Sequence, residues 1–216
     1  IIVLDSGSTD NTIEICERYT RRVYSTDWQG FGVQKQRALD KAIGYWVLSI
    51  DADEQVTADL KSEIQQVIKK SQSDGFEIPR LSSYCGRNIK HAGWWPDYVL
   101  RLFKRESGTF SPDLVHERVI VNGRIAQLKH SLLHEAFINS DEVLTKVNNY
   151  STLGAKKLHD LGEASSLKKA ILKGSWMFFR TYILKLGFLD GKQGLMLAIS
   201  SAEVTYYKYV KLMQLQ

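Results

Sequence analysis

The chain has 216 residues, of which 44% are apolar and 25% charged, and its formal net charge is +5. This composition is that of a globular protein and excludes a disordered or fibrous chain. Cys16 and Cys85 are far apart, and no second Cys or His lies at metal-ligand spacing, so we expect a reducing compartment and neither a disulfide framework nor a zinc site. The basic residues are dispersed, which argues against nucleic acid as a partner.

The first part of the sequence alternates short apolar strands with helices. The expected strands are residues 1–5, 22–25 and 45–54, and the expected helices are residues 9–19, 33–43 and 57–70. Thr9 or Asp10 is the expected cap of the first of these helices, and Thr57 that of the third. This order predicts a parallel sheet with helical crossovers, in which ligands bind beyond the carboxyl ends of the strands.

After Gly75 the pattern changes to strands that follow one another directly. We expect strands at residues 75–84 and 98–105, and a hairpin in residues 118–130 whose two-residue turn is Asn122-Gly123. From residue 140 onward the sequence predicts helices. They are expected at residues 141–161, 167–187 and 194–213.

Two carboxylates, Asp51 and Asp53, end the predicted strand at 45–54. Alternate side chains of an extended strand point the same way, so these like charges would repel unless a cation lay beside them. A hard divalent ion that also binds a diphosphate would remove that repulsion. Taken alone, an Asp-Ala-Asp sequence is more often a solvated turn than a metal site, but Asp5 ends another strand of the same predicted sheet.

These residues resemble the family 2 glycosyltransferases, which have the GT-A fold and use nucleotide-sugars. "IIVLDSGSTDNT" is similar to the first acidic signature of that family, and "GFGVQKQRALDKAIGYWVLSIDADE" to its helix and metal-binding DXD strand. The resemblance implies an α/β GT-A domain at residues 1–139, a helical extension at residues 140–216, and an upstream strand and helix that this sequence lacks.

A narrower resemblance comes from "YCGRNIKHAGWWPDYVLRLFKRESGTFSPDLVHERV" and from "GFLDGKQGL" in the tail. Both are similar to the lipopolysaccharide inner-core β-glucosyltransferases, which transfer glucose from UDP-glucose to a heptose. The resemblance implies an inverting hexosyltransferase with a UDP-sugar donor and a lipid-anchored core oligosaccharide acceptor. A transferase that acts on another bacterial glycan, or a non-catalytic nucleotide- or glycan-binding module, stays open as an alternative.

The resemblance also implies roles for single residues. The residues expected at the donor are Asp5, Gly7, Lys35 and Asp51. Asp53 is expected to bind Mg²⁺ or Mn²⁺ on the diphosphate, with His134 as a further ligand; a lone His is also commonly a hydrogen-bonded structural residue.

Inverting transfer needs a group that takes the proton from the acceptor hydroxyl. Glu117 in "VHERV" matches the position of that base and Asp97 is the second candidate, although Glu117 could equally be a solvated partner of Arg118. Trp94 or Trp95 could stack on the acceptor sugar. Arg101 is the remaining candidate for an acceptor contact.

The segment "WMFFRTYILKLGFL" combines aromatic and aliphatic side chains with Lys and Arg, a composition typical of a helix in a membrane interface. A helix packed against the transferase domain or a partner subunit is the alternative. We expect peripheral contact with the inner face of the cytoplasmic membrane, because a lipid-linked acceptor is met most easily there.

Overall fold

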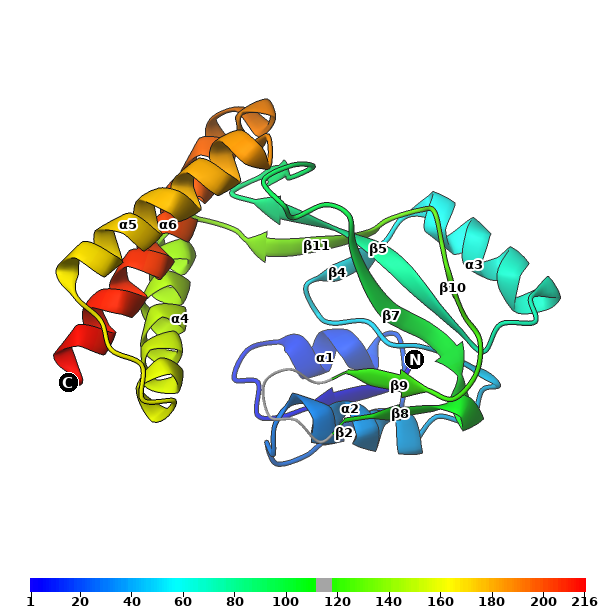
Figure 1. Cartoon of the computed structure of the whole chain (residues 1–216). Helices are drawn as coiled ribbons and strands as arrows, with labels where there is room; N and C mark the ends of the chain where they lie inside the picture. Colours follow the sequence, from blue (N-terminus) through cyan, green and yellow to red (C-terminus); the bar gives the residue numbers. More distant parts are fainter. Residues whose placement is uncertain (112–117) are drawn as a thin grey trace. The chain divides into compact units, whose positions relative to one another are not determined.

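The computed structural model describes residues 1–111 and 118–216 (Figure 1). The chain forms two compact units. The first consists of Ile1–Ala52, Val56–Pro79 and Tyr98–Ser131, and the second of Asp53–Gln55, Arg80–Asp97 and Leu132–Gln216. The predicted helical extension lies wholly within the second unit, and the predicted domain boundary between residues 139 and 140 stays a prediction.

The first unit begins with a parallel strand pair. Strand β1 (Val3–Asp5) pairs directly with β2 (Val23–Ser25). Helix α1 (Thr12–Glu17) connects the two strands, and helix α2 (Phe31–Asp40) follows β2. Both strands were predicted from their apolar residues. The first helix is shorter than predicted and begins after Asn11, because the Asp10 carboxylate accepts a hydrogen bond from the backbone N–H of Thr12 and so holds the preceding turn.

The larger sheet of the first unit is mixed. Strand β3 (Trp46–Leu48) is antiparallel to β7 (Asp97–Lys104), and β10 (Ile125–Gln127) is parallel to β5 (Gly75–Tyr84). A separate antiparallel pair joins β8 (Gly108–Phe110) to β9 (Val119–Val121). Leu39, Phe103 and Phe110 form an apolar cluster in this unit. Such burial is the main favourable contribution to folding.

Helix α3 (Ala58–Lys70) starts where the sequence predicts. The Thr57 hydroxyl accepts a hydrogen bond from the backbone N–H of Leu60 at 3.2 Å, which satisfies one of the unpaired N–H groups of the first turn. Leu60 is fully buried, so the cap and the first apolar contact of the helix lie in the same turn.

The hairpin predicted at Asn122-Gly123 is wrong. Residues 119–121 pair with β8, whereas residues 125–127 pair with β5. The Asp74 carboxylate accepts from the backbone N–H of Arg124, and Ser107 O accepts from that of Asn122. These long-range hydrogen bonds draw the two arms of the expected hairpin to different strands.

The single strand predicted over residues 45–54 is also wrong. The segment forms β3, then residues 49–53 without strand structure, and then β4 (Glu54–Val56). Asp51 and Asp53 therefore do not lie on one extended strand, and they fall in different units. The expectation that both side chains point the same way rested on an extended strand, and residues 49–53 do not form one.

The strands of the second unit follow the order β5-β11-β4, with β6 (Arg87–Asn88) antiparallel to β5. Strand β11 (Leu132–Phe137) runs parallel to β5, and His134 lies opposite Ser82. The core of this unit contains Tyr84, Ile89 and Leu197. It brings the strands and the C-terminal helices together.

Three long helices complete the second unit (Figure 1). They are α4 (Ser140–Asp160), α5 (Leu167–Phe179) and α6 (Gly191–Gln214). Helix α6 packs against both α4 and α5. The single helix predicted at 167–187 is interrupted: a π-helical turn (Arg180–Leu184) and a 3₁₀ turn (Gly187–Asp190) follow α5, with Leu186 in the left-handed region between them. Within the described residues, no helix is long and apolar enough to cross a membrane.

Candidate functional site

Asp5 ends β1 and organises the turn that follows. Its carboxylate accepts hydrogen bonds from the Ser8 hydroxyl and from the backbone N–H groups of Gly7, at 2.9 Å, and Ser8, at 3.1 Å. The hydrogen bond from the Ser8 hydroxyl, followed by that from the Gly7 N–H, lowers the pKa of Asp5. Gly7 has φ +105°, a conformation that favours glycine, so the sequence Asp-Ser-Gly-Ser makes this compact acidic turn possible.

Asp51 lies in the same unit and is held by two cations. Lys35 Nζ is 2.6 Å from Asp51 Oδ1, and the Arg101 guanidinium contacts Asp51 Oδ2. Burial alone would raise the pKa of Asp51, but the positive charges of Arg101 and Lys35 outweigh it, and the pKa lies below its usual range. Lys35 and Arg101, predicted at the donor and the acceptor respectively, thus meet at one carboxylate.

Asp53 belongs to the second unit, where it contacts His134. His134 Nε2 lies 3.4 Å from Asp53 Oδ2, and the other ring nitrogen, Nδ1, lies 2.8 Å from the Ser82 hydroxyl. The contact with His134 lowers the pKa of Asp53 despite partial burial. The Ser82 contact orients the imidazole so that Nε2 faces the carboxylate.

The pair of Asp53 and His134 fits a divalent cation that shares its coordination shell with a diphosphate. Mg²⁺ is commonly bound by one or two carboxylates together with phosphate oxygens and water, and imidazole is a frequent metal ligand. Among residues 1–111 and 118–216, no group of three or more His, Cys, Asp or Glu side chains is arranged to hold a metal ion. Asp53 and His134 are the residues that would hold such a cation, with phosphate oxygens and water as its further ligands.

His134 also lines a cavity of about 410 Å³ in the second unit. The cavity is bounded by charged, polar and aromatic side chains from β5, β11, α4 and the loop that precedes β7. Its lining residues are Arg80, Ser82, Gly93, Trp94, Pro96, Asp97, His134, Ala136, Phe137, Lys146 and Tyr150. A concave site with aromatic walls and a few polar groups is typical of small-ligand binding.

One wall of the cavity carries an ion pair. Arg80 Nε and Nη2 lie 3.0 and 2.7 Å from Asp97 Oδ2, and Arg80 Nη1 lies 3.6 Å from Glu54 Oε1. The Glu54 side chain is fully buried, whereas the Asp97 side chain is partly exposed. Arg80 therefore holds one oxygen of a carboxylate that a bound ligand can reach.

The two tryptophans differ. Trp94 lines the cavity, stacks on Phe137 with ring centroids 6.0 Å apart, and meets Tyr84 edge to face. Trp95 is absent from the described lining of the cavity. The structure thus places Trp94, one of the two predicted aromatic residues, in the lining of the cavity.

The predicted base, Glu117, lies outside the described residues, so its role stays a prediction. Sequence reasoning missed Arg80, Ser82, Lys146 and Tyr150. Arg80 had a signal, because it is a charge within the apolar strand "GFEIPRLSSY". Lys146 and Tyr150 lie on an ordinary amphipathic helix, where no local pattern distinguishes them.

Comparison with known proteins gives one family. Residues 1–120, more than half of the chain, match the family described as "Glycosyl transferase family 2". The lipopolysaccharide core biosynthesis glycosyltransferase LpsC of Rhizobium meliloti is 29% identical over 97% of this chain and 83% of its own length. An uncharacterized glycosyltransferase of Rickettsia conorii is 28% identical over 98% of this chain and 79% of its own. The crystal structure of S. aureus TarS 1-349 in complex with UDP has a TM-score of 0.46 at 15% identity, over all of this chain and 82% of that one.

Proposed function

The chain belongs to glycosyl transferase family 2 and is a glycosyltransferase, and we propose that it transfers glucose from UDP-glucose to a heptose of the lipopolysaccharide inner core. The similarity to LpsC over nearly the whole chain supports lipopolysaccharide core biosynthesis as the process. The donor sugar and the heptose acceptor are part of the proposal, because they follow from the narrower resemblance of residues 84–119 and of the tail.

Acidic and cationic side chains of the first unit bind the donor in this proposal. Asp5 contacts the uracil, with the Gly7 turn around it, and Asp51 lies near the ribose. The ion pairs from Lys35 and Arg101 support this assignment, because they keep Asp51 ionised as an acceptor for hydroxyl groups.

The acceptor binds in the cavity of the second unit. The main support for this proposal is that the cavity is lined both by the aromatic ring of Trp94 and by the ion pair of Arg80 and Asp97. An aromatic ring packs on the apolar face of a pyranose, and charged groups bind its hydroxyls. Lys146 adds a further positive charge, and its Nζ lies 4.3 Å from the centre of the Phe137 ring.

The proposed reaction is a single displacement with inversion. The acceptor hydroxyl attacks the anomeric carbon, the bond from that carbon to the diphosphate breaks, and UDP leaves with the bonding electrons. Glu117 takes the proton of the hydroxyl, as a general base. Mg²⁺ or Mn²⁺, when bound, would stabilise the negative charge of the leaving diphosphate, and Asp53 and His134 are the residues that would hold it.

The proposed acceptor is anchored in a membrane by its lipid, so the protein acts in peripheral contact with the cytoplasmic face of the inner membrane. The apolar side chains that the second unit exposes after α4 support this contact. Those between residues 167 and 189 are Leu167, Ile171, Leu172, Trp176, Phe179, Ile183, Leu184, Leu186, Phe188 and Leu189.

Release of UDP from a panel of UDP-sugars, with and without Mn²⁺, tests the proposal. A heptose-terminated lipopolysaccharide core serves as acceptor, and the same core already capped with glucose serves as its control. We expect metal-dependent release that requires both UDP-glucose and the uncapped core.

Two other results would replace the proposal. Release with another sugar, or with another bacterial glycan in place of the core, would keep the family and change the substrates. Binding of UDP or glycan without any release would favour a non-catalytic binding module, which needs the aromatic and acidic residues but not a base.

A further inference from the structure

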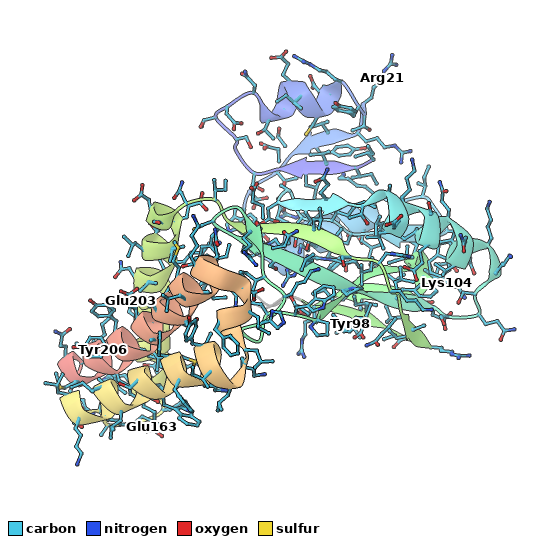
Figure 2. The ribbon with its side chains drawn as sticks, turned by 90° about the horizontal axis from the view of Figure 1, so that it is seen from above. Arg21, Tyr98, Lys104, Glu163, Glu203 and Tyr206 are labelled. Carbon is cyan, nitrogen blue, oxygen red and sulfur yellow. The ribbon has the colours of Figure 1, made fainter. Side chains whose placement is uncertain are left out.

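Helix α5 has two faces of opposite character. Ala170, Gly174 and, in the following π-helical turn, Thr181 are buried. A Cβ on Gly174 would lie 3.1 Å from Tyr206 Cβ, so this face packs closely on α6; Figure 2 labels Tyr206 and Glu203 on that helix. Small residues thus make the contact between the two helices.

The large apolar residues lie on the other face. Leu172, Trp176, Phe179 and Ile183 follow the i, i+4, i+7, i+11 spacing of one helix face, and between 42% and 60% of each residue is exposed. The rings of Trp176 and Phe179 lie 5.9 Å apart. This arrangement reverses that of an ordinary surface helix, which turns its large apolar residues toward the core.

The exposed apolar surface continues past α5. Leu184, Leu186, Phe188 and Leu189 are exposed in the turns that lead to α6. We define the α5 surface as these four residues together with Leu172, Trp176, Phe179 and Ile183. An apolar patch of this kind on a folded protein marks an interaction site.

The segment that carries the α5 surface has charges of one sign, although Lys169 pairs with Glu163 just before it, at 3.3 Å. Residues 167–189 contain five basic residues and no Asp or Glu. The basic residues are Lys168, Lys169, Lys173, Arg180 and Lys185. Aromatic and aliphatic side chains bordered by Lys and Arg match the two layers of an anionic bilayer, its acyl boundary and its phosphate headgroups.

The same segment holds the loop that lines the cavity. Lys185 O accepts a hydrogen bond from the backbone N–H of Ala92 at 2.8 Å. The buried Asp190 carboxylate accepts from the backbone N–H groups of Lys90, at 3.2 Å, and His91, at 2.8 Å. Trp94 follows directly in this loop, so the α5 surface and the cavity wall share one hydrogen-bonded support.

We infer that the α5 surface binds an anionic phospholipid bilayer and thereby holds the cavity beside the membrane. Trp176 and Phe179 enter the acyl boundary, and the surrounding Lys and Arg side chains bind lipid phosphates. The role of the cavity in receiving a lipid-anchored acceptor rests on the proposed function, whereas binding of the surface to lipid does not.

Sedimentation of the full chain with sucrose-loaded vesicles tests the inference without nucleotide or acceptor. We expect about tenfold or stronger binding to vesicles of phosphatidylcholine with phosphatidylglycerol than to phosphatidylcholine alone, and a loss of this preference at high salt. Brominated lipid should quench the tryptophan fluorescence of the chain, and Trp176→Phe should remove most of that quenching.

Two double variants on the α5 segment, with a third on α4 as the control, identify the surface. Trp176→Ser with Phe179→Ser should weaken vesicle binding about tenfold or more. The control, Leu144→Ser with Leu153→Ser, also replaces two exposed apolar residues by Ser, but on α4. These residues are 58% and 56% exposed, and the control should leave binding unchanged. Lys168→Glu with Lys173→Glu should abolish the preference for phosphatidylglycerol.

The inference is overturned if the wild-type chain shows no preference for anionic vesicles, or if the Trp176 and Phe179 pair binds like wild type. A dimer that this pair converts to a monomer, with vesicle binding unchanged, would show that the surface binds a second copy. Transfer to a soluble core oligosaccharide without vesicle binding overturns this inference alone; vesicle binding without transfer overturns only the proposed function.

Discussion

Arg80 holds Asp97 through two nitrogens, Nε at 3.0 Å and Nη2 at 2.7 Å, which both bind the same carboxylate oxygen. Two charge-assisted hydrogen bonds to one oxygen hold that oxygen in place, although they do not fix the plane of the carboxylate as a fork to both oxygens would. Asp97 lines the cavity and was the second candidate for the catalytic base. Its firm attachment to Arg80 favours a role in positioning the acceptor and leaves Glu117 as the first candidate for the base.

Comparison of Glu117→Gln with Asp97→Asn separates these roles. Glu117→Gln should lower kcat by roughly 10²–10⁴ with little effect on UDP binding, as expected for the loss of a general base. Asp97→Asn should act mainly on KM for the acceptor. Steady-state kinetics at saturating UDP-glucose measures both, and a larger fall in kcat for Asp97→Asn would exchange the two assignments.

Asp53→Ala should abolish metal-dependent turnover and leave the fold intact, because the variant removes the carboxylate that contacts His134. Turnover is measured over a series of Mn²⁺ concentrations, and circular dichroism checks the fold. Glu135→Ala is the matched control, since it removes an exposed carboxylate from the neighbouring position on β11. Wild-type activity of Asp53→Ala at saturating Mn²⁺ would refute the metal assignment.

Trp94→Ala should raise KM for the acceptor about two- to tenfold, which corresponds to the 0.5–1.5 kcal/mol typical of an aromatic contact. Trp95→Ala should change this KM much less, because Trp95 is not among the described residues that line the cavity. Initial rates at varied acceptor concentration distinguish the two. Equal effects of both variants would mean that the loss comes from the fold and not from sugar contact.

Gly194→Ala should destabilise the second unit by about 2–3 kcal/mol, because the new Cβ would collide with the backbone oxygen of Gly187. Gly154→Ala is the matched control on another helix, where the Cβ would meet only the flexible side chain of Lys208, at 2.7 Å. We expect this control to be neutral or stabilising, since Ala favours a helix more than Gly. Urea unfolding measures both, and similar stabilities would contradict the close packing at Gly194.

The ion pairs of Asp51 predict how stability depends on pH. The folded pKa of Asp51 is lowered, so its contribution is fully present above the unfolded pKa of about 3.9 and is lost as the pH falls through the folded pKa. Asp51→Asn should therefore lose less stability than wild type over that acidic range, and it should be less stable at neutral pH. Urea midpoints across the range measure this, and parallel curves for the two proteins would contradict it.

The parts of the fold that depend on local pattern were predictable. Apolar runs located β1, β5 and β7, and Thr57 marked the start of α3. The predicted α/β class with a C-terminal helical extension is confirmed, as is membership of the family. The break between β3 and β4 was not predictable, because Asp51 is held by Lys35 and Arg101, which are distant in sequence.

The candidate site was predictable only in part. His134 and Trp94 were singled out in advance and line the cavity, but Lys146 and Tyr150 join them through the packing of α4, which no motif records. The hairpin at Asn122-Gly123 failed for a similar reason, since Asp74 and Ser107 bind its backbone from distant segments. Long-range polar contacts thus account for these errors.

Glucose transfer to a core heptose can be followed by incubating the protein with ¹³C-labelled UDP-glucose and a heptose-terminated core and analysing the product by NMR. We expect one labelled glucose per core, joined to heptose in the β configuration, since a single displacement inverts the α-linked donor. An α-linked product would contradict the single displacement. An unlabelled core, under conditions in which UDP-glucose binds, would contradict the transfer itself.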